Sequence, residues 1–282
     1  MTGIRETRAL LAIDGDSFAH RAYHALPKSI RRANGAPGNA LFGFMSMLLR
    51  LWQAERPRAV VVGWDSLGVP TYRHELLEGY QAGRVFDAEL LEQLDLLPEL
   101  VASTGITCAK VAGFEADDFL AAAAVQEEAR DGLTVVATSD RDAYQLASSR
   151  TTIVQPVRGV SEMARVGPDE VRARYGVEPR QVADFIALRG DSSDRIPGAR
   201  GVGEKTAATL LQTYGSLEGL LEAGRFGAEA ELLRTYRRIA TLDASAPLAP
   251  VVDREPDWAA GADAARQLGL DGLAERLQAF AA

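Results

Sequence analysis

Apolar runs that end at or just before an aspartate recur through the first half of the chain, and this pattern limits the possible folds more than any other feature. The runs and the acids that follow them are Arg8–Ile13 with Asp14, Ala59–Trp64 with Asp65, and Leu133–Thr138 with Asp140. Short continuous apolar runs are typical of strands buried on both faces of a sheet. Segments with helical spacing separate them. The chain therefore predicts an α/β fold with a mainly parallel central sheet and helices on both faces.

The other elements of this half follow from the same periodicity. We expect helices over Pro37–Trp52, Asp87–Ser103 and residues 115–130, and strands over Ile106–Val111 and Thr151–Gln155. Pro98 lies inside the second of these helices and either kinks it or marks a helix start. In parallel sheets, ligands bind beyond the carboxyl ends of the strands. Four acids are expected at that edge: Asp14, Asp65, Glu115 and Asp140.

Three carboxylates, Glu115 among them, gather at the start of an alanine-rich helical segment. Glu115, Asp117 and Asp118 lie within four residues. One interpretation is an ordinary acidic helix start, which the helix dipole favours. However, the acid pairs Asp140/Asp142 and Asp191/Asp194 also occur in turns. Carboxylates brought together repel one another unless cations neutralise them, so the pattern favours a shared metal site.

Composition excludes several classes of protein. Cys108 is the only cysteine, so the chain has no internal disulfide, and this fits a reducing cytosol. No apolar stretch approaches the length of a membrane span, and the N-terminus lacks a signal-peptide pattern. The net charge of −8 at first argues against a nucleic-acid partner. That argument weakens if many acids bind metals, because the local field decides binding.

Strand patterns stop after about residue 165. Helical segments are expected over Pro168–Tyr175 and Pro179–Leu188, followed by a turn-rich loop that holds Asp191 and Asp194. The segment Gly201–Ala207 then opens a helix that continues to about Tyr214. Its glycines and the helix N-terminus suit a phosphate group, although a glycine-capped joint between two helices is the simpler alternative.

Five blocks of the sequence resemble the 5′-nuclease family. The blocks are Ala12–Gly15; Gly63–Asp65 with Tyr72–Glu75 and Gly79–Arg84; Gly113–Phe119; Thr138–Leu146; and Leu188–Ala207. Their order and spacing are similar to those of the flap endonucleases and of the 5′→3′ exonuclease domain of bacterial family-A DNA polymerases. The likeness extends over roughly residues 8–220. No polymerase domain follows in this sequence, which therefore resembles a freestanding member.

The resemblance implies a domain organisation and an activity. Residues 1–165 would form the α/β nuclease core, with a helical arch at 66–104. Residues 166–282 would form a helical region with a helix–hairpin–helix at about 188–214. The implied activity is hydrolysis of DNA phosphodiesters at 5′ flaps and 5′ ends by two-metal-ion catalysis, for primer and flap removal in replication and repair.

The resemblance also implies which residues bind metal. Asp14, Asp65, Glu115 and Asp117 are similar to the family's first-metal set. A second set is implied at the following positions: Asp140, Asp142, Asp191 and Asp194. Asp117 would contact both ions, and Asp118 would act directly or through water. Oxygen ligands of this kind suit Mg²⁺ or Mn²⁺.

Other residues resemble the family's DNA contacts. Arg73 and Arg84 are similar to its phosphate-contacting basic residues, although either could be a solvated arginine. Tyr80 would stack on a base or simply pack. The residues that resemble the helix–hairpin–helix grip on the duplex backbone are Gly201, Gly203, Lys205 and Thr206. This hairpin can also hold K⁺ in the family, and its phosphate contacts are independent of sequence.

The implied partners are DNA substrates: a 5′ flap, a nicked or gapped duplex, and RNA-primed ends. A DNA polymerase acting in trans is also implied. We expect a cytoplasmic, nucleoid-associated monomer with no membrane partner.

The sequence departs from the family pattern at several positions. Gln81 stands where the family often has a lysine, a cation that would offset charge on the phosphate. Asp16 replaces a residue that is usually uncharged or histidine, and it would either contact a metal-bound water or be a solvated turn acid. Arg141 and Arg195 stand where lysine and asparagine are usual. Residues 93–97 resemble a clamp-binding peptide, but their leucines lie in a helix that needs them for packing.

Two other classes of function compete with the nuclease. The segments Asp14–Asp16 and Gly190–Asp194 also resemble a haloacid-dehalogenase-type phosphatase, with Asp14 as nucleophile and Asp16 as general acid. That fold requires a lysine shortly before its last acidic motif, and none occurs between Lys110 and Lys205. The third class, a DNA-structure-binding protein without catalysis, does not explain the complete set of acids.

Overall fold

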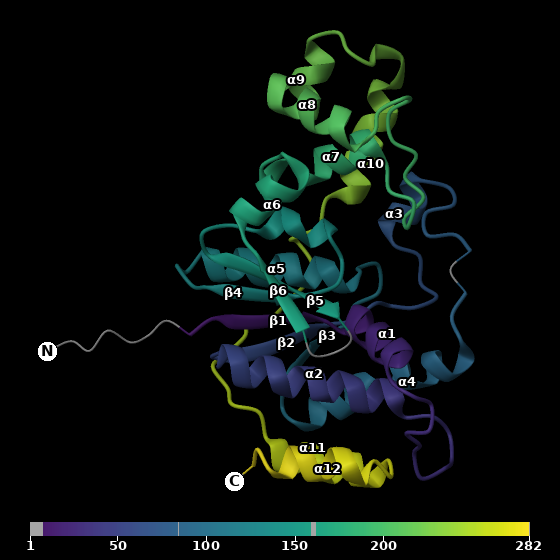
Figure 1. The fold of residues 1–282 in the computed structure, drawn as a ribbon, viewed down its shortest axis with the longest axis vertical. Helices are drawn as coiled ribbons and strands as arrows, with labels where there is room; N and C mark the ends of the chain where they lie inside the picture. The colour runs from purple at the N-terminus through teal and green to yellow at the C-terminus, as the bar shows by residue number, and fades with distance from the viewer. Residues whose placement is uncertain (1–7, 84, 159–161, 282) are drawn as a thin grey trace, which may run out of the picture.

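A six-stranded sheet runs through the middle of the molecule (Figure 1). The computed structural model describes residues 8–83, 85–158 and 162–281. The strands are β1 (Leu10–Asp14), β2 (Ala59–Gly63), β3 (Thr107–Ala109), β4 (Thr134–Ala137), β5 (Thr151–Arg158) and β6 (Glu162–Val166). Their order is β3-β2-β1-β4-β5-β6, and only the pairing of β5 with β6 is antiparallel among these strands. The prediction of a mainly parallel α/β sheet is confirmed.

Alternation along the strands divides the apolar core into two layers. In β1, Leu10 and Ala12 face one buried cluster, and Leu11 and Ile13 face the other. Successive side chains of a strand point to opposite faces, so a strand covered on both sides must be apolar throughout. This explains why the central strands read as unbroken apolar runs.

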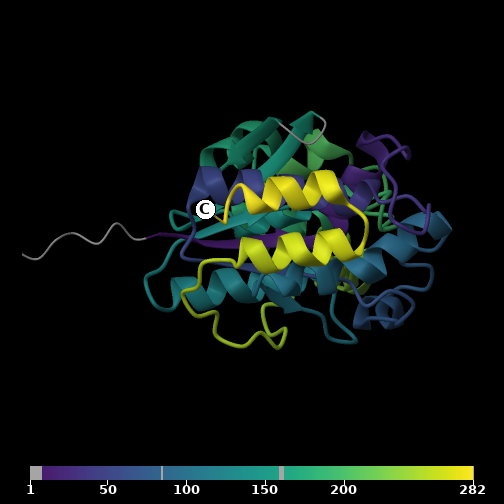
Figure 2. The same ribbon diagram turned by 90° about the horizontal axis from the view of Figure 1, so that it is seen from below.

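Helices cover both faces of the sheet (Figures 1 and 2). The face that contains Leu11 and Ile13 packs against α1 (Gly15–Ala25), α2 (Asn39–Glu55) and α4 (Ala88–Ser103). The opposite face packs against α5 (Ala116–Glu128) and the 3₁₀ helix η1 (Asp142–Leu146). Pro98 lies inside α4, and Asp87 caps that helix by accepting the Glu89 amide at 3.1 Å.

A helical region extends from one end of the core. Its elements are α6 (Pro168–Tyr175), η2 (Pro179–Gln181), α7 (Val182–Arg189), α8 (Glu204–Tyr214), α9 (Leu217–Glu222), η3 (Gly227–Glu229) and α10 (Ala230–Ala240). The chain then returns along the core to α11 (Trp258–Gln267) and α12 (Asp271–Gln278), which lie side by side beyond α2 (Figure 2). The expected helical C-terminal region is confirmed, while its boundary at residue 165 stays a prediction.

The structure contains elements that the periodicity does not predict, α1 and β6 among them. Helix α1 begins immediately after Asp14 and has two histidines and an arginine on its partly exposed side, which hides its periodicity. Strand β6 is a partly exposed edge strand, so it lacks the apolar run of the buried strands. The 66–104 region contains α4 and the short helix α3 (Tyr72–Leu76). Among the described residues, no helix has both the length and the apolarity to span a bilayer.

Candidate active site

The end of β1 provides the first carboxylate of the site. Asp14 is the last residue of this strand and also the N-cap of α1. Its carboxylate accepts hydrogen bonds from the Ser17 amide at 2.9 Å and the Thr138 hydroxyl at 2.7 Å. Burial and the neighbouring Asp65 raise the pKa of Asp14 to about 7. A carboxylate held in this way binds a proton or a cation readily.

The end of β2 brings a second carboxylate against α5. Asp65 accepts the Ala116 amide at 2.7 Å. The helix approaches so closely that a Cβ at Gly63 would lie 2.4 Å from the Ala116 carbonyl oxygen, so only glycine fits here. Asp16 accepts the Asp65 amide at 2.7 Å, and burial, followed by repulsion from Asp65, raises the Asp16 pKa. Asp16 is therefore part of the site, not a solvated turn acid.

The start of α5 adds two acids. Glu115 accepts the hydroxyls of Thr71 at 3.0 Å and Tyr80 at 3.2 Å, and burial raises its pKa to about 7 although Arg73 opposes the shift. Burial also raises the pKa of Asp117. One oxygen of Asp117, Oδ1, is buried and has no hydrogen-bond partner among the described residues. Such an atom requires a further ligand.

The remaining acids come from η1 and from the loop after α7. Asp140 accepts the Asp142 amide at 2.9 Å, and burial, followed by repulsion from Asp140, raises the pKa of Asp142. Asp191 accepts the Ser193 amide at 2.8 Å within its own turn. The Gln81 amide group donates to Asp194 at 3.2 Å, so the 66–104 region contacts this loop.

One cavity of about 640 Å³ collects these side chains. Nine carboxylates line it: Asp14, Asp16, Asp65, Glu115, Asp117, Asp140, Asp142, Asp191 and Asp194. The other charged residues at its wall include Arg141 and Arg189. Within the described parts of the chain, no three acidic, histidine or cysteine side chains lie in a ready arrangement around a single ion. The acids line the wall of the cavity instead, and its volume of about 640 Å³ can accommodate a phosphate group and cations.

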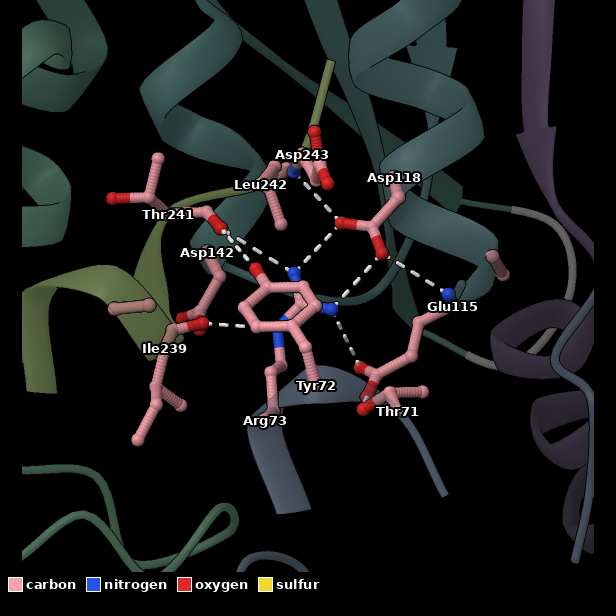
Figure 3. Close-up of polar contacts among 12 residues, drawn as sticks. Thr71, Tyr72, Arg73, Glu115, Asp118, Asp142, Ile239, Thr241, Leu242 and Asp243 are labelled. Atoms are coloured by element: carbon pink, nitrogen blue, oxygen red, sulfur yellow. Dashed lines mark hydrogen bonds and ion pairs between the residues drawn. The ribbon is translucent and has the colours of Figure 1, made fainter. Parts of the chain in front are cut away.

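Arg73 and Asp118 form a pair beside the cavity. Asp118 is not among the residues that line the cavity, and it is fully buried. Arg73 borders the cavity, but its guanidinium makes a two-pronged ion pair with Asp118 at 2.9 and 2.7 Å (Figure 3). Arg84 lies outside the described residues.

The predicted DNA contacts divide into a buried and an exposed set. Tyr80 is 4% exposed and packs edge-on against His74, with its hydroxyl on Glu115. The exposed set lies at the start of α8: Gly201, Gly203, Lys205 and Thr206. Cβ atoms added at its two glycines would face open space among the described residues. This surface is open to a ligand, and its identification as a helix–hairpin–helix stays a prediction.

Sequence reasoning misses the uncharged parts of the site. Thr71 and Gln145 have no pattern that marks them, and the segment 239–243 contributes mainly through its backbone. Ile239, Ala240 and Leu242 nevertheless line the cavity. The available signals are the position of Thr71 immediately before the Tyr72–Glu75 block and the position of Gln145 inside the Thr138–Leu146 block.

Known proteins are similar to this chain in sequence and in fold. The family model for the "5′-3′ exonuclease, N-terminal resolvase-like domain" matches residues 9–176, and the one for the "5′-3′ exonuclease, C-terminal SAM fold" matches residues 177–255. DNA polymerase I of Mycobacterium leprae is 44% identical over 232 residues, which cover 80% of this chain and 25% of that protein. The thermostable DNA polymerase I of Thermus thermophilus is 37% identical over 281 residues, 95% of this chain and 32% of that protein.

This chain therefore spans about a quarter to a third of the length of these relatives. Among solved structures, T5 5′-exonuclease with divalent metal ions (zinc) bound has a TM-score of 0.69 at 20% identity, covering 98% of this chain and all of that one. The catalytic core of Rad2 in complex with DNA substrate has a TM-score of 0.59 at 17% identity, covering 96% and 92%. These two likenesses show the fold alone. The sequence matches identify this chain as a member of the 5′-3′ exonuclease family.

Proposed function

We propose that the protein is a structure-specific 5′-nuclease that hydrolyses DNA phosphodiesters at 5′ flaps and 5′ ends with two divalent metal ions. The observation that carries this proposal is the convergence of nine carboxylates from separate parts of the chain on one cavity. So many anions would repel a phosphodiester unless cations lay between them. Family membership supports the same reaction class.

The donor set fits divalent cations. All the candidate ligands are carboxylates, which suit Mg²⁺ or Mn²⁺, and Asp117 has a buried oxygen without a partner among the described residues. We assign one ion to Asp14, Asp65, Glu115 and Asp117. The residues assigned to the other ion are Asp140, Asp142, Asp191 and Asp194, with Asp117 between the two groups. When bound, such ions lower the pKa of a coordinated water and offset charge on the leaving oxygen.

The chain's own residues would orient these ligands and the substrate. Thr138 and Ser17 hold Asp14, Thr71 and Tyr80 hold Glu115, and Gln81 contacts Asp194. The exposed start of α8, with Lys205 and Thr206, would contact duplex phosphates through backbone amides and one cation. The turn before α8 would also bind a K⁺ ion.

The proposed partners are 5′-flap, nicked and gapped DNA and RNA-primed ends, with a DNA polymerase acting in trans. We further propose that the protein acts as a monomer in the cytoplasm, at the nucleoid. The known relatives give no support to the phosphatase alternative, since the matching family models describe exonucleases.

The decisive experiment uses an end-labelled duplex with a 5′ flap, incubated with Mg²⁺ or with EDTA. We expect cleavage near the flap junction only with the metal, and none by Asp140→Asn, which removes one charge at the cavity. Asp271→Asn is the matched control, because Asp271 is an exposed acid at the start of α12, far from the cavity. Absence of any metal-dependent product, or release of phosphate from small monoesters instead, would contradict the proposal.

A further inference from the structure

The Arg73 side chain is the most enclosed cation of the site, and its hydrogen bonds are internal. Only 2% of the residue is exposed. Besides the two bonds to Asp118, its Nε donates to the Ile239 carbonyl at 3.0 Å, and Nη2 donates to the Thr241 carbonyl at 3.3 Å (Figure 3). An arginine that contacts a substrate phosphate needs free donors on the solvent side. Here four donor contacts point into the protein.

The Asp118 carboxylate also makes its hydrogen bonds inside the protein. Its Oδ1 accepts Arg73 Nη2 at 2.7 Å and the Asp243 amide at 2.8 Å, while Oδ2 accepts Arg73 Nη1 at 2.9 Å and the Glu115 amide at 3.1 Å. An ionised carboxylate has about four acceptor positions, and these four bonds use them. Asp118 therefore joins α3, the start of α5 and the segment 239–243, instead of facing the cavity.

The segment 239–243 is also attached to the other group of acids. Gln145 in η1 donates to the Ala240 carbonyl at 2.9 Å and accepts the Leu242 amide at 3.0 Å. The same side chain donates to the Asp142 carbonyl at 2.8 Å. One short stretch of backbone therefore contacts the supports of Glu115 on one side and of Asp142 on the other.

Helix α10 connects this stretch to the loop that carries Asp191 and Asp194. The segment 239–243 begins at the end of α10, which packs against α7 within one buried cluster. Helix α7 ends at Arg189, directly before that loop. A shift of 239–243 would thus move the loop acids relative to Glu115 and Asp117.

We propose that Arg73 and Asp118 are positioning residues that hold the segment 239–243 on α5 and so set the distance between the two groups of carboxylates. This inference rests on the proposed nuclease function. A misplacement of about 1 Å in such a site lowers the rate about 10²-fold. The proposal replaces the phosphate contact that the family resemblance implies for Arg73, and it removes Asp118 from the metal ligands.

The two roles of Arg73 differ in what a substitution changes. If Arg73 positions the acids, Arg73→Met lowers kcat on a flap duplex about 10²-fold and leaves KM and the salt dependence of DNA binding unchanged. Arg73→Lys does not restore the rate, because an ammonium group cannot make the planar four-contact set. If Arg73 contacts a phosphate, Arg73→Met raises KM and reduces the magnitude of the slope of log K for DNA binding against log salt by about 0.9. Arg73→Lys then restores much of the DNA binding. That second result would overturn the proposal.

Asp118 and a distant pair provide the controls. Asp118→Asn should match Arg73→Met both in kcat and in the Mg²⁺ concentration needed for half-maximal rate, because both variants release the same contact; a requirement raised well above that of Arg73→Met would make Asp118 a ligand and contradict us. Arg58→Met breaks a similarly buried pair with Glu127 at the opposite end of β2, so it should lower stability and leave kcat unchanged. If Arg73→Met does not fold, the apolar double variant Arg73→Met/Asp118→Leu tests the same point, since it leaves no unpaired charge. Wild-type protein without metal-dependent cleavage would instead refute the nuclease function itself.

Discussion

The two groups of carboxylates in the cavity are built in different ways. At the ends of β1 and β2, Asp14 and Asp65 accept backbone amides from helices that pack on the sheet, Ser17 of α1 and Ala116 of α5. The loop after α7 is different. Asp191 bonds within its own turn and to Arg189 at the end of α7, and the Asp194 carboxylate accepts from the Gln81 side chain.

This difference shows which part of the site is fixed by the core and which part depends on the helical region. The sheet-end acids cannot move without moving a helix. The loop acids keep their place only as long as α7, α10 and the 66–104 region do. We therefore expect changes in core packing to displace the sheet-end acids. Changes in the contacts between the helical region and the core should displace the loop acids.

The largest effect should come from removing a sheet-end charge. Asp14→Asn keeps the size of the side chain, and we expect flap cleavage to fall about 10³-fold, whereas Asp194→Asn should fall about 10²-fold. Single-turnover rates at saturating Mg²⁺ measure both. Equal losses at the two positions would contradict the contrast between the groups.

Gly63→Ala should disturb the sheet-end group without changing any charge. The added Cβ would lie 2.4 Å from the Ala116 carbonyl oxygen, so α5 must shift with Glu115 and Asp117. We expect a loss of stability of about 1–3 kcal/mol and a rate about 10²-fold lower. Gly227→Ala, where a Cβ meets open space among the described residues, is the control. Unchanged kinetics in the Gly63 variant would show that α5 tolerates displacement.

The stability of the metal-free protein should decrease as pH rises, because ionised carboxylates are costly to bury. The pKa values of Asp14 and Glu115 are raised to about 7 from 3.8 and 4.5, so the folded state binds more protons than the unfolded state between these values. Stability therefore falls as pH rises from about 4 to about 7. Urea midpoints in EDTA measure this trend, and Mg²⁺ should reduce it. A flat profile in EDTA would be inconsistent with the burial of these acids.

Gln81→Ala tests the weaker group and should have the smallest effect. It removes the hydrogen bond to Asp194, which is worth about 0.5–1.5 kcal/mol, so the Mg²⁺ concentration for half-maximal rate should rise by about 2- to 10-fold. Metal titrations of the cleavage rate measure this change. An unaltered requirement would mean that the arch region does not support the loop acids.

Much of the core fold can be predicted because burial on two faces leaves a visible pattern. The runs before Asp14 and Asp65 form β1 and β2, and the parallel sheet follows from the helices between strands. Eight of the nine acids that line the cavity are candidates from their positions after strands and in turns. Asp16 is the ninth, and its side chain contact with the Asp65 amide cannot be read from spacing.

The supports of the site are harder to predict, for a physical reason. Ile239 and Thr241 contact Arg73 through carbonyl oxygens, which every residue has, so no side-chain pattern marks them. The pairing of Arg73 with Asp118 depends on how α3 meets α5 in three dimensions. From the sequence alone, a buried arginine and a phosphate-binding arginine look alike.

The helices α11 and α12 also have a consequence for how the protein folds. They close the layer of α2 and α4, and the Arg276 guanidinium donates to the Ser46 hydroxyl, 230 residues earlier in the chain. A contact between such distant parts of the chain restricts the long segment between them, which costs conformational entropy. Folds with many contacts of this kind fold slowly. During synthesis, the apolar surfaces of α2 and α4 stay uncovered until α11 and α12 emerge. We expect the exposed apolar surface of α2, and not the carboxylate site, to determine how much the protein aggregates or needs chaperones in this interval.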